Sequence, residues 1–171
     1  MKPMKIEDPS WESTYMNFAK GVASHSKAVK AKVGCVIAKG DKIISLGYNG
    51  TPPGWDNTCE DRVCHQHKTY DEATGAEGLR MDCKLVTRPE VVHAEINAIA
   101  KVARSNESCE GATLYVTKAP CIECAKAIIM SGISTVFFTG DFDMCDEDGP
   151  ALMLASGLNV IVLDDHGESY V

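Results

Sequence analysis

The sequence is poor in the features that mark membrane, secreted and nucleic-acid-binding proteins. No apolar run approaches the ~18 residues needed to cross a bilayer, and the polar residues 1–10 lack the apolar core of a signal peptide. The chain has only 6% aromatic residues, no basic cluster larger than Lys27, Lys30 and Lys32, and a net charge of -7. Such a chain repels a long polyanion, so we expect a cytoplasmic protein that binds neither membranes nor nucleic-acid polymers.

The length and composition suit one globular domain. The 171 residues include 44% hydrophobic and 24% charged residues, an ordinary balance for a folded protein. Residues 51–90 combine Pro52-Pro53-Gly54 with scattered charges and few aliphatic side chains. We therefore expect one domain over residues 1–171 with a long insert at about 51–90. Eight cysteines in a chain without a signal peptide favour metal or thiol chemistry over a disulfide framework.

Hydrophobic spacing and turn residues predict alternating helices and strands outside the insert. The alternation in the second half favours parallel strands joined by right-handed crossovers, whereas Lys39-Gly40-Asp41 predicts an antiparallel hairpin nearer the start. The sheet is therefore expected to be mixed, with helices on both faces. The predicted helices cover residues 10–25, 93–104, 121–131 and 149–155, and the predicted strands cover residues 33–38, 42–47, 113–117, 135–139 and 159–163.

Two short segments, each at the start of a predicted helix, carry residues suited to binding a metal. Pro120 precedes Cys121 and Cys124, and two cysteines three residues apart at a helix start can face one point. The helix N-terminus there favours thiolates over thiols. His93, at the start of a second helix, completes three protein ligands. Three ligands with an open position for water are typical of a catalytic zinc ion, whereas structural zinc sites close with four.

Glu95 is the candidate for proton transfer beside this metal site. It follows His93 by two residues, so the two side chains leave the first turn in different directions, and the carboxylate can lie near the metal without binding it. Pro-Cys-x-x-Cys alone also fits a redox pair or half of a structural zinc site, and His-x-Glu alone indicates little. In combination, the two segments resemble the zinc-site signature of nucleobase deaminases.

Three longer segments narrow this resemblance. Residues 47–52 (Gly-Tyr-Asn-Gly-Thr-Pro), 92–99 (Val-His-Ala-Glu-Ile-Asn-Ala-Ile) and 115–117 (Tyr-Val-Thr) resemble the deoxycytidylate deaminase family, and its phage members above all. The resemblance covers roughly residues 15–163. It implies a three-layer α/β/α sandwich with a mixed five-stranded sheet, the cytidine-deaminase-like fold. It also implies hydrolysis of dCMP to dUMP and ammonia, which supplies dUMP for thymidylate synthesis.

The resemblance implies effectors and an assembly as well. Members commonly form homo-hexamers that are activated by dCTP with Mg²⁺ and inhibited by dTTP, and a phage-encoded member works in the host cytoplasm. Arg104, at the end of the predicted helix 93–104, aligns with an arginine that the family places at the regulatory site between subunits. The alternative is that Arg104 is only a cation at a helix C-terminus, where it complements the helix dipole.

Three residues outside the metal site are implied in substrate binding. Asn49 lies in the turn where the family binds the nucleotide, although Asn-Gly is also a common turn pair. Ser26 and Lys27, at the end of the first predicted helix, match a Ser-Lys position expected near the 5′-phosphate. Lys27 has the same alternative reading as Arg104, because a cation is favourable at a helix end.

The insert carries a second group of potential ligands. Some family members hold a structural zinc ion here, and Cys59 matches one of its ligand positions, whereas Ala28 stands at another. The family's ligand set is therefore not reproduced intact, and a solvated loop with inert thiols is the alternative. A closed four-ligand site would use Cys59, Cys64, His67 (or its neighbour His65) and Cys83.

Other functions remain as alternatives at this level. A deaminase of tRNA or single-stranded DNA shares the zinc motif, but it needs basic and aromatic surface, and this chain has little of either. Deaminases of free cytidine usually carry Cys where His93 stands. A non-catalytic zinc-binding module is the alternative from another class, and it has no use for a non-ligand acid such as Glu95.

Overall fold

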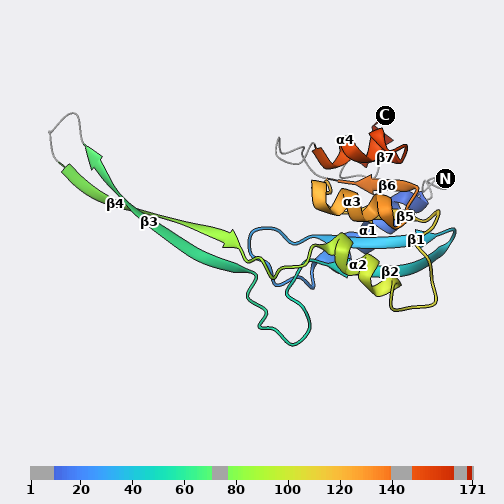
Figure 1. Ribbon diagram of the computed structural model, residues 1–171, viewed down its shortest axis with the longest axis horizontal. Coiled ribbons are helices and arrows are strands. Elements are labelled where there is room, and N and C mark those ends of the chain that lie inside the picture. Colours follow the sequence, from blue (N-terminus) through green and yellow to red (C-terminus); the bar gives the residue numbers. More distant parts are fainter. Residues whose placement is uncertain (1–9, 71–76, 140–147, 164–168, 171) are drawn as a thin grey trace, which may run out of the picture.

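The computed structural model describes residues 10–70, 77–139, 148–163 and 169–170. A sheet with helices on both faces forms the body of the molecule, and a long ribbon of two strands projects away from it (Figure 1). None of the helices in these residues is long and apolar enough to span a membrane. The helices are α1 (Trp11–Ala23), α2 (Ala94–Val102), α3 (Ile122–Met130) and α4 (Asp148–Ala155). The strands are β1 (Gly34–Lys39), β2 (Lys42–Tyr48), β3 (Glu60–Tyr70), β4 (Glu77–Thr87), β5 (Thr113–Val116), β6 (Thr135–Phe138), β7 (Asn159–Leu163) and β8 (Ser169–Tyr170).

The main sheet is mixed, as predicted. Its strand order is β2-β1-β5-β6-β7-β8. β1 runs antiparallel to both β2 and β5, whereas β5, β6 and β7 are parallel to one another. The first five strands in this order are the predicted five-stranded sheet, and the two-residue β8 adds a short antiparallel edge beside β7. The crossovers through α3 and α4 supply the parallel connections that the alternating pattern indicated.

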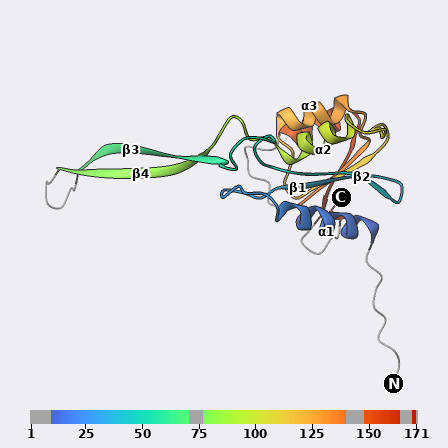
Figure 2. The same ribbon diagram turned by 90° about the horizontal axis from the view of Figure 1, so that it is seen from below.

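Two apolar clusters make the molecule three-layered. α1 covers one face of the sheet, and α2 and α3 cover the other (Figure 2). Along β1, Cys35 and Ile37 belong to the cluster under α2 and α3, whereas Val36 and Ala38 belong to the cluster under α1. Because successive strand residues point to opposite faces, a strand buried on both sides is apolar throughout. The continuous apolar run at 33–38 therefore marks a central strand.

Local signals set the limits of the first elements. The Ser10 side chain accepts a hydrogen bond from the Ser13 N–H and caps α1, which ends at Ala23, two residues before the end of the predicted range. Gly40 has φ 61° in the turn between β1 and β2, a left-handed conformation that glycine adopts without steric cost.

The insert differs from the irregular excursion that its composition suggested. Most of it forms the ribbon of β3 and β4, which pair in continuous register from Glu60 opposite Thr87 to Tyr70 opposite Glu77. Apolar side chains alternate along 79–85 of β4, but β3 is polar at nearly every position. A strand with both faces in water needs no apolar alternation, so periodicity could not reveal β3.

The predicted second zinc site is not formed, and neither is the expected set of free thiols. Cys64 and Cys83 stand opposite each other in the ribbon and are joined by a disulfide, so their sulfur atoms are not available to a metal. His67 is three residues beyond Cys64 and therefore points to the other face, where it pairs with Asp82 at 3.4 Å. Cys59 is buried before the ribbon begins. Within the described residues, the one group of three or more potential metal ligands lies elsewhere.

Candidate active site

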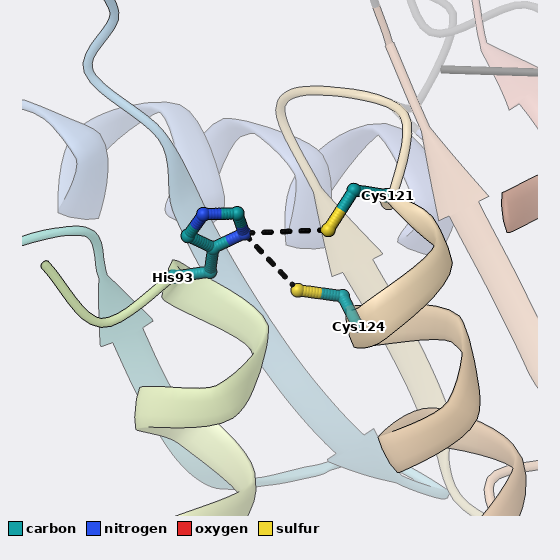
Figure 3. A group of neighbouring side chains, drawn as sticks. All are labelled: His93, Cys121 and Cys124. Carbon is teal, nitrogen blue, oxygen red and sulfur yellow. Dashed lines mark hydrogen bonds between the residues drawn. The ribbon is translucent and has the colours of Figure 1, made fainter. Parts of the chain in front are cut away.

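Two helix starts on the same side of the sheet meet at the candidate active site. His93 is the N-cap of α2 and Cys121 is the N-cap of α3, both with extended backbone conformations. Neither side chain caps its own helix. The side chains of His93, Cys121 and Cys124 instead point toward one another between the two helices (Figure 3). The structure therefore brings together the three ligands that the sequence predicted from segments 28 residues apart.

The spacing of these three side chains fits a tetrahedral zinc ion. The Nδ1 atom of His93 lies 3.5 Å from the sulfur of Cys121 and 3.3 Å from that of Cys124, and all three ligand atoms lie within 4.8 Å of one another. At usual zinc–ligand distances, a tetrahedral site separates nitrogen from sulfur by about 3.6 Å. Two thiolates and one imidazole are also the donors that zinc prefers. Both nitrogen–sulfur distances therefore lie within a few tenths of an ångström of those at a tetrahedral zinc ion.

The pKa values of the two thiols are shifted in opposite directions. Hydrogen bonds from Cys124 and His93 lower the pKa of Cys121 to about 3. The same contact with Cys121, together with burial, raises the pKa of Cys124 far above its ordinary value. The hydrogen bond to Cys121 also raises the pKa of His93. A cation that binds both sulfur atoms must therefore displace the proton that Cys124 retains.

Glu95 is the one carboxylate among the described residues that is buried, with 4% of its surface exposed. Burial raises its pKa, against the lowering effect of its own backbone N–H and of nearby His93. It also contacts the Cys124 thiol. A carboxyl group with a raised pKa takes up and releases protons closer to neutral pH, which suits acid–base chemistry beside the three ligands.

A pocket opens in front of this group. It is bounded by the segment between α1 and β1, the turn after β2, the base of the ribbon and the loop that leads into α3. Charged side chains of both signs line this pocket beside the candidate ligands. Its lining includes His93, Glu95, Cys121, Asn49, Lys30, Lys118 and Glu60.

Asn49 lines the pocket, but much of its side chain holds the pocket wall together. Its Oδ1 atom accepts the Val33 N–H at 2.8 Å, and its Nδ2 atom donates to the Ala31 carbonyl at 2.9 Å. Ser26 is completely buried, donates to the Asn49 carbonyl and accepts the Ala28 N–H. The Ser26 hydroxyl therefore supports the wall from behind.

The predicted phosphate contacts Ser26 and Lys27 are not among the residues that line this pocket, whereas Lys30 and Lys118 are. Lys30 belongs to the small basic group noted in the sequence, three residues after Lys27. Lys118 lies three residues before Cys121, near the start of the loop from β5 to α3. The sequence signal that could have identified Lys118 was its position close to the predicted ligand Cys121. Arg104 is exposed two residues after the end of α2 and is not part of the pocket.

Two glycines allow the close approaches that position the helix starts. A Cβ atom on Gly47 of β2 would overlap the Ala94 carbonyl and the backbone of Ala98, so α2 lies directly on this strand. A Cβ atom on Gly149 at the start of α4 would overlap the Pro120 carbonyl, next to Cys121. The geometry of the three ligands thus depends on contacts from β2 and α4.

Comparison with known proteins identifies the family of this chain. The family model for the cytidine and deoxycytidylate deaminase zinc-binding region matches residues 9–139. Deoxycytidylate deaminase of Enterobacteria phage T4 is 35% identical over 169 residues (86% of this chain, 87% of the relative). The phage T2 protein is 34% identical over 169 residues (86% and 89%). The structure of dCMP deaminase from cyanophage S-TIM5, in complex with dCMP and dUMP, is 29% identical with a TM-score of 0.71 and covers 91% of this chain and 98% of its own. This chain therefore belongs to the cytidine and deoxycytidylate deaminase zinc-binding family.

Proposed function

We propose that this protein hydrolyses dCMP to dUMP and ammonia and so supplies dUMP for thymidylate synthesis. The observation that carries the proposal is the pocket lined by His93, Cys121, buried Glu95, Lys30 and Lys118, with Cys124 beside the two ligands that line it. One part of the pocket thus carries the metal ligands and the acid that deamination requires, and its walls carry cations that can bind a phosphate. The phage relatives that cover most of the chain are deoxycytidylate deaminases, which supports the same substrate.

His93, Cys121 and Cys124 would hold the zinc ion, which lowers the pKa of a bound water and makes it a nucleophile near neutral pH. Glu95 takes the proton from the water that attacks C4 of cytosine and gives a proton to N3 of the ring. It then takes the second proton of that water from the hydroxyl group on C4 and delivers it to the exocyclic amine. The C4–N bond breaks, ammonia leaves, and C4 becomes a carbonyl of uracil. Burial of Glu95 excludes bulk water as a competing proton donor.

Substrate recognition falls to the pocket walls. Lys30 and Lys118 provide positive charge in a chain of net charge -7, as a nucleotide monophosphate requires. Asn49 retains one amide hydrogen and one acceptor lone pair after its bonds to Val33 and Ala31, and these can reach the nucleotide. Ser26 contributes indirectly, because its hydroxyl group bonds to the backbone of Asn49 and Ala28 in this wall.

The proposal is tested by offering dCMP, deoxycytidine, cytidine and a short single-stranded oligonucleotide in parallel and following the loss of cytosine absorbance. We expect kcat/KM for dCMP to exceed that for deoxycytidine by at least 100-fold, since a charge-assisted phosphate contact is roughly twice as strong as a neutral hydrogen bond and several are available. Comparable values for the nucleoside would remove the case for a phosphate-reading pocket. Preferred turnover of the oligonucleotide would assign the chain to polymer editing instead.

We further propose that the protein assembles into homo-hexamers activated by dCTP with Mg²⁺ and inhibited by dTTP. A triphosphate bound between subunits needs an exposed cation, and Arg104 lies exposed beyond the end of α2. The other end of the same helix carries His93 and Glu95, so a small shift of α2 would reach the active site.

A further inference from the structure

The wall of the pocket between α1 and β1 has little apolar packing to hold it in place. Val29 in the middle of this segment is 73% exposed, and Lys30 and Ala31 are exposed as well. Ser26 and Asn49 hold the two ends of the segment through hydrogen bonds. Asn49 also holds the Ala31 carbonyl, but neither residue bonds to Val29 or Lys30 at the centre, where Lys30 enters the lining of the pocket.

The centre of this segment is supported from the base of the ribbon. Both carboxylate oxygens of Glu60, the first residue of β3, accept the Val29 N–H, at 3.0 and 3.1 Å. One of them also accepts the Lys30 N–H at 3.2 Å. Bonds from backbone N–H groups to a carboxylate are charge-assisted and stronger than neutral ones. Glu60 thus fixes the two peptide groups of exposed Val29 and Lys30, which lie between buried Ala28 and the Ala31 carbonyl held by Asn49.

Glu60 itself lines the pocket, yet its negative charge is unsuited to binding a phosphate directly. We propose that Glu60 is a positioning residue that holds the backbone of Val29 and Lys30 so that the Lys30 ammonium faces the phosphate of the substrate. The ribbon base is then part of substrate recognition. This inference rests on the proposed function, because it deepens the assignment of Lys30.

The test compares Glu60→Ala, Lys30→Ala and the double variant with dCMP and with deoxycytidine as substrates. We expect Glu60→Ala to raise KM for dCMP about 10-fold with kcat within about twofold, as loss of one charge-assisted hydrogen bond would. The double variant is expected to be no worse than Lys30→Ala alone, because the two residues act in series. kcat/KM for deoxycytidine, which has no phosphate, should stay within about twofold in all three.

Glu60→Gln is the conservative variant, because it keeps an acceptor oxygen of the same reach, and it should recover most of the native KM. Amide hydrogen exchange should become faster at Val29 and Lys30 in Glu60→Ala, a readout that does not depend on catalysis. Glu77→Ala, at the far end of the same ribbon, is the matched control and should change neither KM nor exchange. Bound zinc and thermal midpoint are measured for every variant.

A KM for dCMP within twofold of native in Glu60→Ala would overturn the inference, as would additive effects in the double variant. Equal impairment with dCMP and deoxycytidine would also overturn it, because Glu60 would then act on the fold and not on Lys30. If the native protein itself failed to prefer dCMP, the proposed function would fail and this inference with it. If the native protein prefers dCMP but the KM of Glu60→Ala for dCMP is unchanged, this inference fails and the proposed function stands.

Discussion

Glu95 and His93 show how much two positions on one helix turn can differ. His93 is exposed at the mouth of the pocket, whereas Glu95 has 4% of its surface exposed and a pKa raised by burial. The two-residue spacing places one side chain for metal binding and the other for proton transfer. Spacing alone indicated the two directions, but the burial that raises the pKa of Glu95 comes from the surrounding core.

Replacing Glu95 by Gln is expected to retain the fold and the zinc while lowering kcat for dCMP by ~10²–10⁴-fold, because the amide keeps the shape but cannot exchange protons. Steady-state kinetics and elemental analysis measure the two effects. Glu123→Gln is the control, since Glu123 lies on the first turn of α3 but is exposed and pairs with Lys126. Turnover by Glu95→Gln close to the native rate would show that another group moves the protons.

Tyr115 offers a test of burial on the other face of the sheet. Burial and, after it, the charge of Glu12 raise its pKa to about 12. Folding favours the neutral phenol, so this stabilisation is fully present below the ordinary pKa of about 10 and is lost as the pH rises towards 12. Tyr115→Phe should retain the stacking on Phe137, whose ring centroid is 5.0 Å away.

We expect Tyr115→Phe to match the native protein in free energy of unfolding at pH 8 and to lose less stability than the native protein above pH 10. Urea unfolding of both proteins across this pH range measures the difference. Parallel loss in the two proteins would mean that Tyr115 ionises as easily in the folded state as in the unfolded state.

At the scale of elements, the active site depends on how closely helices lie on strands. β2 can approach the start of α2 only because residue 47 has no side chain. The α2 helix carries both His93 and Glu95, so its distance from β2 sets where the metal ligand and the proton carrier lie. A sequence pattern shows that residue 47 is glycine, but not which helix lies against it.

Gly47→Ala is therefore expected to displace α2, lower the free energy of unfolding by about 1–3 kcal/mol and reduce bound zinc and activity together. Denaturant unfolding and elemental analysis measure these effects. The control is Gly21→Ala in α1, where a Cβ atom meets nothing within 4 Å and a better helix former should stabilise slightly. Full zinc binding and native kinetics in Gly47→Ala would show that the strand and helix can separate without consequence.

The ribbon is the element that the sequence described least well. Its strands contact each other along their length, and polar residues cover most of their surface. The register of the pair decides the chemistry of its cysteines: it places Cys64 opposite Cys83 and puts His67 on the other face. A disulfide forms where spacing along the chain had suggested a four-ligand zinc site.

At the scale of the whole molecule, α2 links two surfaces that the proposed regulation requires. It has 9 residues, a length of about 13 Å at 1.5 Å per residue. The active site lies at its N-terminus, and exposed Arg104 follows its C-terminus. An effector bound near Arg104 in an oligomer would thus be one short helix away from Glu95.

Arg104→Glu is expected to lower the mass of the protein in solution and to weaken the response to both dCTP and dTTP, while zinc binding stays intact. Velocity against dCMP is recorded with and without each effector, alongside light scattering. The reversal of charge at exposed Arg62 in the ribbon is the control. Unchanged mass and unchanged regulation in Arg104→Glu would exclude Arg104 from the regulatory site.

The sequence by itself determined the features that depend on neighbours along the chain. His93, Glu95, Cys121 and Cys124 lie at helix starts, and three- and two-residue spacings direct their side chains whatever the rest of the fold does. The alternation of helices and strands likewise indicated a mixed sheet with helices on both faces, because each amphipathic element must bury its apolar side.

Only the tertiary structure decided the features that depend on distant neighbours. One pocket is lined by Lys30, Glu60 and Lys118, because β1, β5 and the ribbon base lie next to one another there. The spacing of residues along the chain does not show which of these elements are neighbours. The Ser26 hydroxyl group does not line the pocket, because it forms hydrogen bonds with two backbone groups. The position of Ser26 beside Lys27 in the sequence did not indicate these bonds. The physical reason is that register and strand order are set by packing across the whole sheet, whereas the sequence pattern records only which face of each element is buried.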